Sequence, residues 1–416
     1  MKTVEETVKN AREASWSIGE ADTNQKNSAL EEIAQKLQEN KDKIIEANSK
    51  DLEELKKKEG YSRAFHDRLL LDGDRIEGMA DGLRDIIYLN DPVGEVTSMW
   101  KRPNGLQVGR IRVPLGVVAI IYEARPNVTI DAAGLGIKSG NSVVLRGSSE
   151  ALNSNKALVE VIQEGLRAAG LPENGVVLVE QTDRESATDL MRQNRYLDVI
   201  IPRGGAALKK TVMENATVPV VETGEGNCHT FVDESAEVES AVSIAVNAKV
   251  QRPGVCNAME TLLVHKNIAD AFLPKALEAL VNEGVEIRGC PVTANHHREV
   301  KAASEDDWAT EYLDLVLSVK VVESAEEAVK HVNTYGTGHS EAIITNSYSN
   351  SRKFMQRVDA AAVYVNASTR FTDGNAFGLG AEMGISTQKL HARGPMGLES
   401  LTSSKYIVYG DGQVRG

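Results

Sequence analysis

One of the three cysteines of this chain lies in a setting that suits a nucleophile. Cys256 belongs to the segment Gln251–Ala258, in which a Pro-Gly pair predicts a turn and small or polar residues follow the cysteine. A thiolate in such an accessible loop can attack an acyl carbon and form a thioester. Most cysteines are instead inert, small apolar side chains, and we interpret Cys228 and Cys290 in this way.

Three glycine-rich segments bear on phosphate binding. Gly134–Gly140 and Gly378–Gly384 each hold one residue too many for the dinucleotide-binding pattern G-x-G-x-x-G, and we interpret both as turns. In Ile201–Ala206 a buried strand would break at Gly204 and Gly205, and a helix beginning there would present free N–H groups to a pyrophosphate. An ordinary turn between a strand and a helix fits the same spacing equally well.

A pair of histidines invites comparison with zinc sites. His296 and His297 follow Cys290 closely, but adjacent side chains diverge and no second thiolate is near in sequence. We therefore predict a solvated surface here, and no metal site in the protein.

The elements that would position these residues begin with a helical block. Between residues 21 and 89, apolar side chains recur at i, i+3, i+4 and i+7 with charged residues between them. The clearest set is Leu30, Ile33, Ala34 and Leu37. Pro92 and Gly94 end the block, and the alternating segment Leu106–Val113 predicts a half-buried strand.

From residue 115 to 221 short apolar runs alternate with helical stretches. This pattern predicts strands buried on both faces in a parallel sheet, as in doubly wound nucleotide-binding domains. The expected strands are Gly116–Tyr122, Ser142–Leu145, Val176–Val179, Asp198–Ile201 and Val218–Val221, and the expected helices include Ala151–Ala169 and Glu185–Asn194.

A second α/β section follows Cys256. Its expected strands are Thr261–Val264, Val316–Val322, Ala342–Thr345 and Ala362–Val365, and its expected helices are Ile268–Asn282 and Ser324–Val332. The chain closes with a short strand, Tyr406–Tyr409. We expect that strand to pair with Leu106–Val113 in a small sheet that serves a contact between subunits.

The composition limits the classes of protein that fit. A net charge of -13 and a pI near 5.3 argue against binding to nucleic acid. The first 21 residues lack the apolar core of a signal peptide, and no window of about 18 apolar residues follows, so we expect no membrane segment. The sparse, odd set of cysteines favours a reducing compartment, and we predict a cytoplasmic protein.

The order of several motifs resembles that of the aldehyde dehydrogenase superfamily. The motifs are Glu123–Asn127, Gly140–Ser148, Val221–Gly226, Cys256, Glu311–Leu313 and Val365–Gly378. Within that superfamily, Tyr122–Ile130, Gln251–Ala258 and Phe377–Ser386 closely resemble the branch that reduces L-glutamyl 5-phosphate to L-glutamate 5-semialdehyde in proline biosynthesis.

This resemblance implies an α/β fold of the aldehyde dehydrogenase type, with two doubly wound domains and a small β oligomerisation arm. Residues 1–100 and 114–230 would form the dinucleotide-binding domain, residues 231–394 the catalytic domain, and residues 101–113 and 395–416 the arm. A homodimer or homotetramer is implied.

The resemblance also assigns catalytic roles. Cys256 would expel phosphate from the substrate and carry the acyl group as a thioester. Asn127 matches the amide that stabilises the oxyanion together with the backbone N–H of Cys256, although it would equally serve as a helix cap. Glu222 matches a water-activating base, but Thr223-Gly224-Glu225 replaces the usual Leu-Gly-Gly after it. Because reduction needs no water, Glu222 is either structural or serves to poise Cys256.

The implied cofactor is NADP(H). Where NAD-preferring relatives carry Lys and, three residues later, Glu, this chain has Arg146 and Ser149, which removes repulsion toward a 2′-phosphate. Ser148, Gly204 and Gly205 complete the expected phosphate contacts. Glu311 matches the residue that holds the nicotinamide ribose.

The amino acid end of the substrate requires cations or free N–H groups. Arg125, Arg252, Ser368 and Arg370 are the candidates, with Asp373 nearby, and each charged residue fits a structural ion pair as well. Phosphate would be the second product, and the lability of the acyl phosphate leaves open a contact with glutamate 5-kinase.

Two other functions fit parts of this pattern. An oxidising aldehyde dehydrogenase for another short acyl group would turn over without phosphate. A non-catalytic protein on the same fold would show slow, uniform alkylation of all three cysteines, whereas an enzyme would show one fast thiol.

Overall fold

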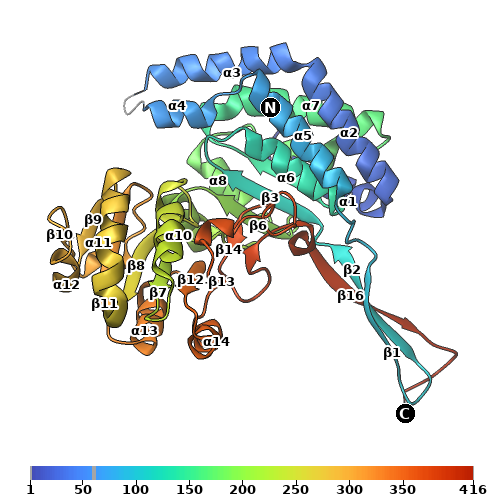
Figure 1. Ribbon diagram of the computed structural model, residues 1–416. Coiled ribbons are helices and arrows are strands. Elements are labelled where there is room, and N and C mark those ends of the chain that lie inside the picture. Colours follow the sequence, from blue (N-terminus) through green and yellow to red (C-terminus); the bar gives the residue numbers. More distant parts are fainter. Residues whose placement is uncertain (1, 59–61, 416) are drawn as a thin grey trace. The chain divides into compact units, whose positions relative to one another are not determined.

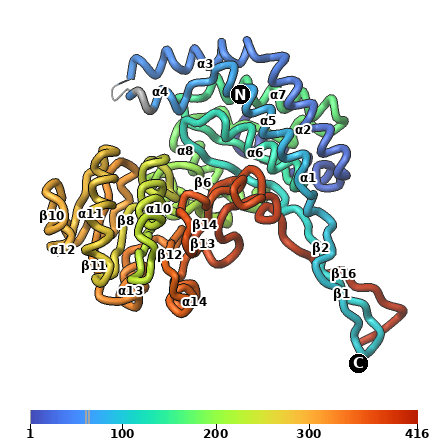
Figure 2. Tube along the Cα trace, in the orientation of Figure 1, coloured from blue at the N-terminus to red at the C-terminus, as the bar shows by residue number. Residues whose placement is uncertain are grey.

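The computed structural model describes residues 2–58 and 62–415 and divides into two compact units (Figures 1 and 2). The first unit comprises Met1–Thr223, Gly378–Gly384 and Met396–Gly416, and the second comprises Gly224–Phe377 and Ile385–Pro395. Met1, residues 59–61 and Gly416 lie outside the described residues, so the predicted helical block is untested at 59–61. The cofactor-binding and catalytic roles predicted for these regions stay predictions.

The first unit contains a parallel sheet in the order β5-β4-β3-β6. Its strands are β3 (Val117–Tyr122), β4 (Ser142–Arg146), β5 (Val176–Leu178) and β6 (Val199–Arg203). All four were predicted from apolar runs, and every residue of β3 is buried. This burial is what a strand covered on both faces requires.

Helices account for most of the rest of the first unit. They are α1 (Val4–Glu20), α2 (Thr23–Glu39), α3 (Lys41–Lys56), α4 (Arg63–Leu69), α5 (Gly73–Tyr88), α6 (Asn127–Lys138), α7 (Leu152–Ala168), α8 (Arg184–Leu190) and α9 (Ala206–Asn215), with short 3-10 turns at Ser149–Ala151, Glu173–Gly175 and Leu398–Leu401. The predicted apolar face of α2 is confirmed, since its four apolar residues are almost completely buried. Among the described residues, no helix combines the length and the apolar character that crossing a membrane requires.

The segment Gly134–Gly140 is mostly helix, which corrects the prediction of a turn. Gly134 and Gly136 lie inside α6, where an added Cβ would come within 2.6 Å of Leu83 and 2.2 Å of Val143, respectively. Only Gly140, with φ of 75°, has the left-handed backbone of a turn. Gly134 and Gly136 therefore allow α6 to pack closely against its neighbours.

A three-stranded antiparallel sheet extends away from the helices of the first unit (Figure 1). Its strands are β1 (Val96–Lys101), β2 (Gln107–Pro114) and β16 (Thr402–Tyr409), in the order β1-β2-β16. The pairing of β2 with the C-terminal strand is confirmed. Strand β1 was not predicted, because all six of its residues are exposed and no apolar alternation marks it.

The predicted strand Val218–Val221 is wrong. Only one isolated bridge, between Val220 and Ile200, joins this segment to β6. Pro219 lacks the N–H that a longer ladder needs, and the chain then continues toward the second unit.

The second unit is built on a parallel sheet in the order β10-β9-β11-β8-β7-β12-β13. Its strands are β7 (Cys228–Val232), β8 (Met259–His265), β9 (Glu286–Gly289), β10 (Lys301–Ala302), β11 (Val316–Val322), β12 (Ser340–Ile344) and β13 (Ala362–Val365), and a hairpin adds β14 (Ile385–Ser386) and β15 (Gly394–Pro395). Its helices are α10 (Val238–Val250), α11 (Lys266–Asn282), α12 (Pro291–Ala294), α13 (Ala325–Tyr335) and α14 (Tyr348–Arg357), with 3-10 turns at Asp306–Ala309 and Thr369–Phe371.

The central strand β7 was missed for a physical reason. It buries His229 and Thr230 among apolar neighbours, and the next strand in the sheet buries Glu341. His229 Nδ1 and the backbone N of His229 both lie within 3.2 Å of Glu341 Oε2, so one carboxylate oxygen joins the two strands. A polar pair of this kind interrupts the apolar run that predicts a buried strand.

A buried ion pair anchors the helical layer of the first unit. Lys26 Nζ lies 3.0 Å from Asp91 Oδ2, and the side chains are 1% and 7% exposed. Asp91 also accepts hydrogen bonds from Thr23 Oγ1 and the backbone N of Val93. The carboxylate therefore connects the start of α2 to the segment after α5.

Replacing this carboxylate should destabilise the first unit. Asp91→Leu leaves the Lys26 ammonium buried without its partner, which costs about 3–5 kcal/mol. The expected result is faster hydrogen exchange in peptides from α2 and α5. Glu160→Ala is the control, because its pair with Lys43 is more than half exposed and is worth at most about 1 kcal/mol. Equal exchange in the two variants would contradict the prediction.

Candidate active site

Cys256 lies in the loop between α10 and β8 of the second unit. Its side chain is half-buried, whereas Cys228 is fully buried. Cys228 Sγ donates a hydrogen bond to the carbonyl of Cys256 at 3.1 Å. Burial raises the pKa of Cys228 well above its usual value, so this thiol stays protonated and serves as a donor.

The backbone before β7 lies directly against the Cys256 loop. A Cβ added to Gly226 would be 1.5 Å from the carbonyl oxygen of Cys256 and 2.7 Å from its Cα. Only a glycine allows this approach.

The residue after Cys256 fixes the other side of the loop. Asn257 Nδ2 donates to the carbonyl of Thr372 at 2.8 Å, and Thr369 Oγ1 donates to the carbonyl of Asn257 at 2.8 Å. These contacts bring the segment Ser368–Asp373, which holds two of the predicted substrate residues, alongside Cys256.

Two predicted arginines lie close to this loop. Arg370 Nε donates to Gln251 Oε1 at 2.9 Å. The pKa of Arg370 is lowered, first by burial and next by the positive charge of Arg252, while Cys256 and Asp373 act in the opposite direction. Ser368 is buried, and its Oγ accepts a hydrogen bond from the backbone N of Arg370. The second unit therefore gathers cations beside the thiol.

Glu311 also lies in the second unit and contacts the same loop region. Its Oε1 accepts a hydrogen bond from Gly226 N at 2.7 Å. The carboxylate predicted to hold a ribose thus also holds the glycine that supports Cys256.

The remaining predicted residues belong to the first unit. Asn127 is the first residue of α6 and is exposed. Its Nδ2 donates to Asp131 Oδ2 at 3.2 Å, and burial raises the pKa of Asp131 to about 6. The cap position is Pro126, so the alternative interpretation of Asn127 as a helix cap is wrong.

Arg146 ends β4 and is held by backbone carbonyls. Its Nη2 donates to Thr182 O and Asp183 O, both at 3.1 Å, and its Nε is buried with no hydrogen-bond partner in the described structure. Burial lowers the pKa of Arg146 from its usual value. Ser148 is half-buried and Ser149 is exposed in the turn that follows. An orphaned guanidinium N–H beside a serine-rich turn fits a phosphate ligand.

Gly204 and Gly205 lie between β6 and α9, as predicted. Gly205 N donates to Glu123 Oε1 at 2.9 Å, so a carboxylate occupies this helix N-terminus. Arg125 is exposed and lies two residues after Glu123. This turn therefore binds a carboxylate, and in the structure that carboxylate is the side chain of Glu123.

Glu222 lies near the end of the first segment of the first unit, Met1–Thr223, and is half-buried. The residues on both sides are anchored to β6, through Val221 N to Ile200 O and Thr223 Oγ1 to Pro202 O, both at 3.0 Å. Its backbone position is therefore fixed by neighbours.

Sequence reasoning missed Lys249 and Glu260, which form a buried ion pair on either side of the Cys256 loop. The sequence gives little signal for this pair, because α10 also holds Glu239 and several polar residues, and only Glu260 is a charged residue within a mostly apolar strand.

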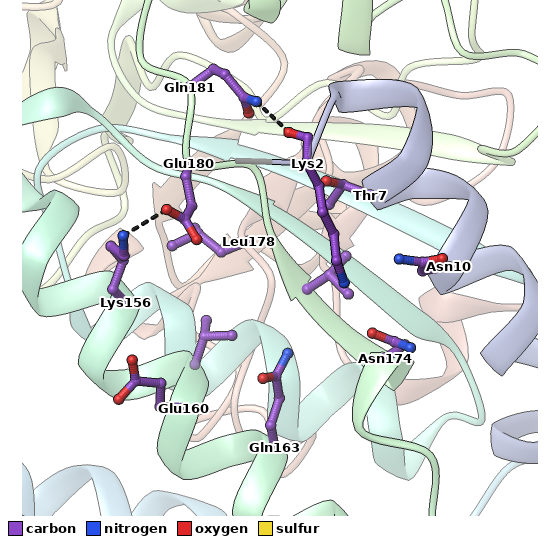
Figure 3. A pocket seen from close by; sticks show the side chains of 12 residues that line it. Lys2, Thr7, Asn10, Lys156, Glu160, Gln163, Asn174, Leu178, Glu180 and Gln181 are labelled. Carbon is purple, nitrogen blue, oxygen red and sulfur yellow. Dashed lines mark hydrogen bonds and ion pairs between the residues drawn. The ribbon is translucent and has the colours of Figure 1, made fainter.

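A separate cleft of about 390 Å³ lies in the first unit, between α1, α7 and β5. Figure 3 shows its polar lining, in which Lys156 pairs with Glu180 at 2.6 Å and Gln181 donates to the carbonyl of Lys2. None of the predicted catalytic, cofactor or substrate residues lines it.

Enlarging Gly226 should displace the Cys256 loop. Gly226→Ala would force the Cys256 backbone to move, at a cost of about 1–3 kcal/mol, and should slow alkylation of Cys256 by iodoacetamide, measured by peptide mass spectrometry. Gly254→Ala is the matched control, because its added Cβ would meet only Leu313 O, at 3.6 Å. Neither glycine has a left-handed backbone, so replacing it by alanine adds no backbone strain in either variant, and the two variants differ only in steric contact. Equal alkylation rates in the two variants would contradict the account of Gly226.

Comparisons with known proteins agree with this geometry. The chain matches the model of the aldehyde dehydrogenase family over residues 1–288 and 298–407. It is 60% identical over 405 residues to the γ-glutamyl phosphate reductase of Clostridium botulinum, covering 97% of this chain and 98% of the relative. It is also 60% identical to that of Caldicellulosiruptor bescii, with all of both chains covered.

A solved structure extends the comparison to the fold. The crystal structure of γ-glutamyl phosphate reductase from Thermotoga maritima is similar with a TM-score of 0.98 and 51% identity, and 100% of each chain is covered. This likeness confirms the predicted fold class. The chain therefore belongs to the aldehyde dehydrogenase family, and within it to the family of γ-glutamyl phosphate reductases.

Proposed function

We infer that this protein is an oxidoreductase of proline biosynthesis that reduces L-glutamyl 5-phosphate to L-glutamate 5-semialdehyde and releases phosphate. The observation that carries this inference is the identity of about 60%, over the full length, with enzymes named γ-glutamyl phosphate reductase. The Cys256 loop of the second unit supplies the chemistry.

In the proposed cycle the thiolate of Cys256 attacks the acyl phosphate carbon. A C–S bond forms, the C–O bond to phosphate breaks, and phosphate leaves with the electron pair. The nicotinamide cofactor, when bound, supplies the hydride that reduces the thioester carbon. Protonation and cleavage of the C–S bond then release the aldehyde and return the thiol.

Asn127 is proposed to stabilise the oxyanion formed in each addition step. Its amide is exposed at the first turn of α6, and a donor of this kind is worth roughly 3 kcal/mol. Glu222 has no water to activate in this cycle, because the acyl group leaves as aldehyde. We assign it an accessory role in supporting the site.

NADPH is the proposed cofactor. The orphaned Nε of Arg146 supports a 2′-phosphate contact, and Ser148 and Ser149 bring no carboxylate that would repel it. We propose that Gly204 and Gly205 bind the pyrophosphate, which would displace the Glu123 carboxylate from Gly205 N. We propose that Glu311 binds the nicotinamide ribose.

The α-carboxylate of the substrate is proposed to bind the cations beside Cys256. Arg252 is close enough to Arg370 for its positive charge to lower the pKa of Arg370, and Ser368 holds the backbone of Arg370. A bound carboxylate would relieve the repulsion between these two cations. We propose Arg125, in the first unit, as a further contact.

The arm formed by β1, β2 and β16 is proposed to join copies of the chain into a homodimer or homotetramer. Its outer strands expose Trp100 and Tyr406, whose rings make an edge contact at 6.4 Å, and such edges favour pairing with another chain. We place the enzyme in the cytoplasm and propose a contact with glutamate 5-kinase, because the acyl phosphate is labile.

Replacing the nucleophile tests the mechanism. Cys256→Ala should lower the phosphate-dependent oxidation of glutamate 5-semialdehyde with NADP⁺ by about 10⁴-fold or more, as for other catalytic nucleophiles. Cys290→Ser, at a half-buried thiol in the cap position before α12, is the control and should keep its rate. Activity that survives in Cys256→Ala would refute the thioester, and turnover without phosphate would favour an oxidising aldehyde dehydrogenase.

Replacing Arg146 tests the choice of cofactor. Arg146→Ala should raise KM for NADPH by about 10- to 100-fold, since a hydrogen bond to a charged group is worth about 1.5–3 kcal/mol. KM for NADH should change little, which makes NADH the internal control. An equal rise for both cofactors would show that Arg146 supports the turn and does not read the 2′-phosphate.

A further inference from the structure

A buried ion pair brackets the loop that carries Cys256. Lys249 lies on α10 before the loop and Glu260 on β8 after it, their Nζ and Oε2 atoms are 2.5 Å apart, and both side chains are 0% exposed. The pair therefore ties the two ends of the loop together within the second unit. The reaction proposed above uses neither group.

Stability alone is a poor explanation for this pair. Burial raises the pKa of Glu260 to about 7 and lowers the pKa of Lys249, while the attraction between the two opposes both shifts. Removing two charges from water costs several kcal/mol for each ion. Apolar side chains of similar volume commonly fill such a space with equal or greater stability.

The second oxygen of Glu260 connects the pair to another segment. Glu260 Oε1 accepts a hydrogen bond from Leu313 N at 3.1 Å. Leu313 has φ of 55°, a left-handed backbone that a leucine adopts only where its surroundings hold it. The carboxylate therefore fixes a residue in an uncommon conformation.

That residue leads back to the nucleophile. Two positions earlier, Glu311 Oε1 accepts a hydrogen bond from Gly226 N at 2.7 Å. Gly226 in turn lies against the carbonyl of Cys256, and Gly254 of the same loop would meet Leu313 O at 3.6 Å if it carried a Cβ. A short series of direct contacts thus runs from Glu260 to the Cys256 backbone.

We propose that Lys249 and Glu260 are positioning residues for the nucleophile. Lys249 holds the Glu260 carboxylate, and that carboxylate fixes the Leu313 amide. Leu313 then sets Glu311 against Gly226, and so sets the Cys256 loop. The proposal rests on the assignment of Cys256 as the nucleophile.

Two double variants separate positioning from stability. Lys249→Met with Glu260→Gln removes both charges and keeps an oxygen for Leu313 N, but leaves an amide NH₂ without a partner. Lys249→Met with Glu260→Met removes that oxygen and leaves no polar group on either side chain. Each variant leaves one donor without its protein partner, the amide NH₂ in the Met/Gln variant and the Leu313 N–H in the Met/Met variant. Leu313 is 47% exposed, so water can replace its lost partner, whereas the amide lies at a fully buried position. Stability alone therefore ranks the Met/Met variant equal or higher, because an orphaned buried donor is costly. Positioning ranks the Met/Gln variant higher.

The main measurement is the rate of Cys256 alkylation by iodoacetamide, with Cys290 as the internal reference. The Met/Met variant should react about tenfold more slowly than the parent, the size expected when one hydrogen bond is lost. Its kcat should fall and its KM for NADPH should rise, with the NADPH-to-NADH preference unchanged because Arg146 is intact. The Met/Gln variant should stay close to the parent in all of these values.

Three results would overturn the proposal. The first is a folded Met/Met variant whose Cys256 alkylation rate and kcat equal those of the parent. The second is an equal loss of activity in the two double variants. The third is a loss of activity that is proportional, across the variants, to the fall in their melting temperature. If the Met/Met variant does not fold, Glu260→Asp replaces it, since it keeps the charge for Lys249 and withdraws the oxygen from Leu313. Glu260→Asp with parental rates would also overturn the proposal.

The alkylation rate needs no turnover, so it separates the two hypotheses. If Cys256→Ala kept its phosphate-dependent activity, the proposed function would fail whatever the double variants showed. Normal loss of activity in Cys256→Ala, together with unaltered double variants, would leave the function standing and remove the role of the pair.

Discussion

The close approach of Gly226 to the carbonyl of Cys256 is the constraint on which the rest of the second unit's site depends. Strands β7 and β8 are parallel neighbours, with Cys228 opposite Met259. The segments that precede neighbouring parallel strands meet at the same sheet edge. Gly226 and Cys256 are therefore brought together by the sheet itself, and the missing Cβ allows their backbones to touch. The other contacts of the loop add to this arrangement.

Much of the fold was predictable from sequence because buried parallel strands appear as short apolar runs. Strands such as β3, β4 and β11 were found for this reason. Strands β1 and β7 were not predicted, because they lack such a run. Strand β1 has no buried face, and β7 buries a histidine against Glu341. At Val218–Val221 the opposite happened: a strand was predicted from an apolar run, but Pro219 has no N–H with which to extend the pairing beyond one bridge. Periodicity reports burial, and it reports pairing only indirectly.

The candidate site was predictable to the extent that its residues occur in recognisable strings. Cys256, Arg370 and Glu311 were selected in this way, and the second unit brings them close to one loop. The residues that support them carry no such mark. Lys249 and Glu260 resemble ordinary surface charges in sequence, since charged residues are rarely fully buried. The Glu123 carboxylate at Gly205 was equally hidden, because the contact joins elements about eighty residues apart. Support of this kind becomes visible only when tertiary contacts are known.

The burial of α6 has a mechanical consequence for Asn127. Ten of its twelve residues are buried, and two glycines inside it leave no space for even a methyl group. A helix of this length is a rod of about 18 Å that transmits a displacement along its axis. Pressure on Gly134 or Gly136 would therefore be felt at the first turn, where the amide of Asn127 lies. The position of that amide therefore depends on the packed interface around Gly134 and Gly136, which tolerates almost no change in volume.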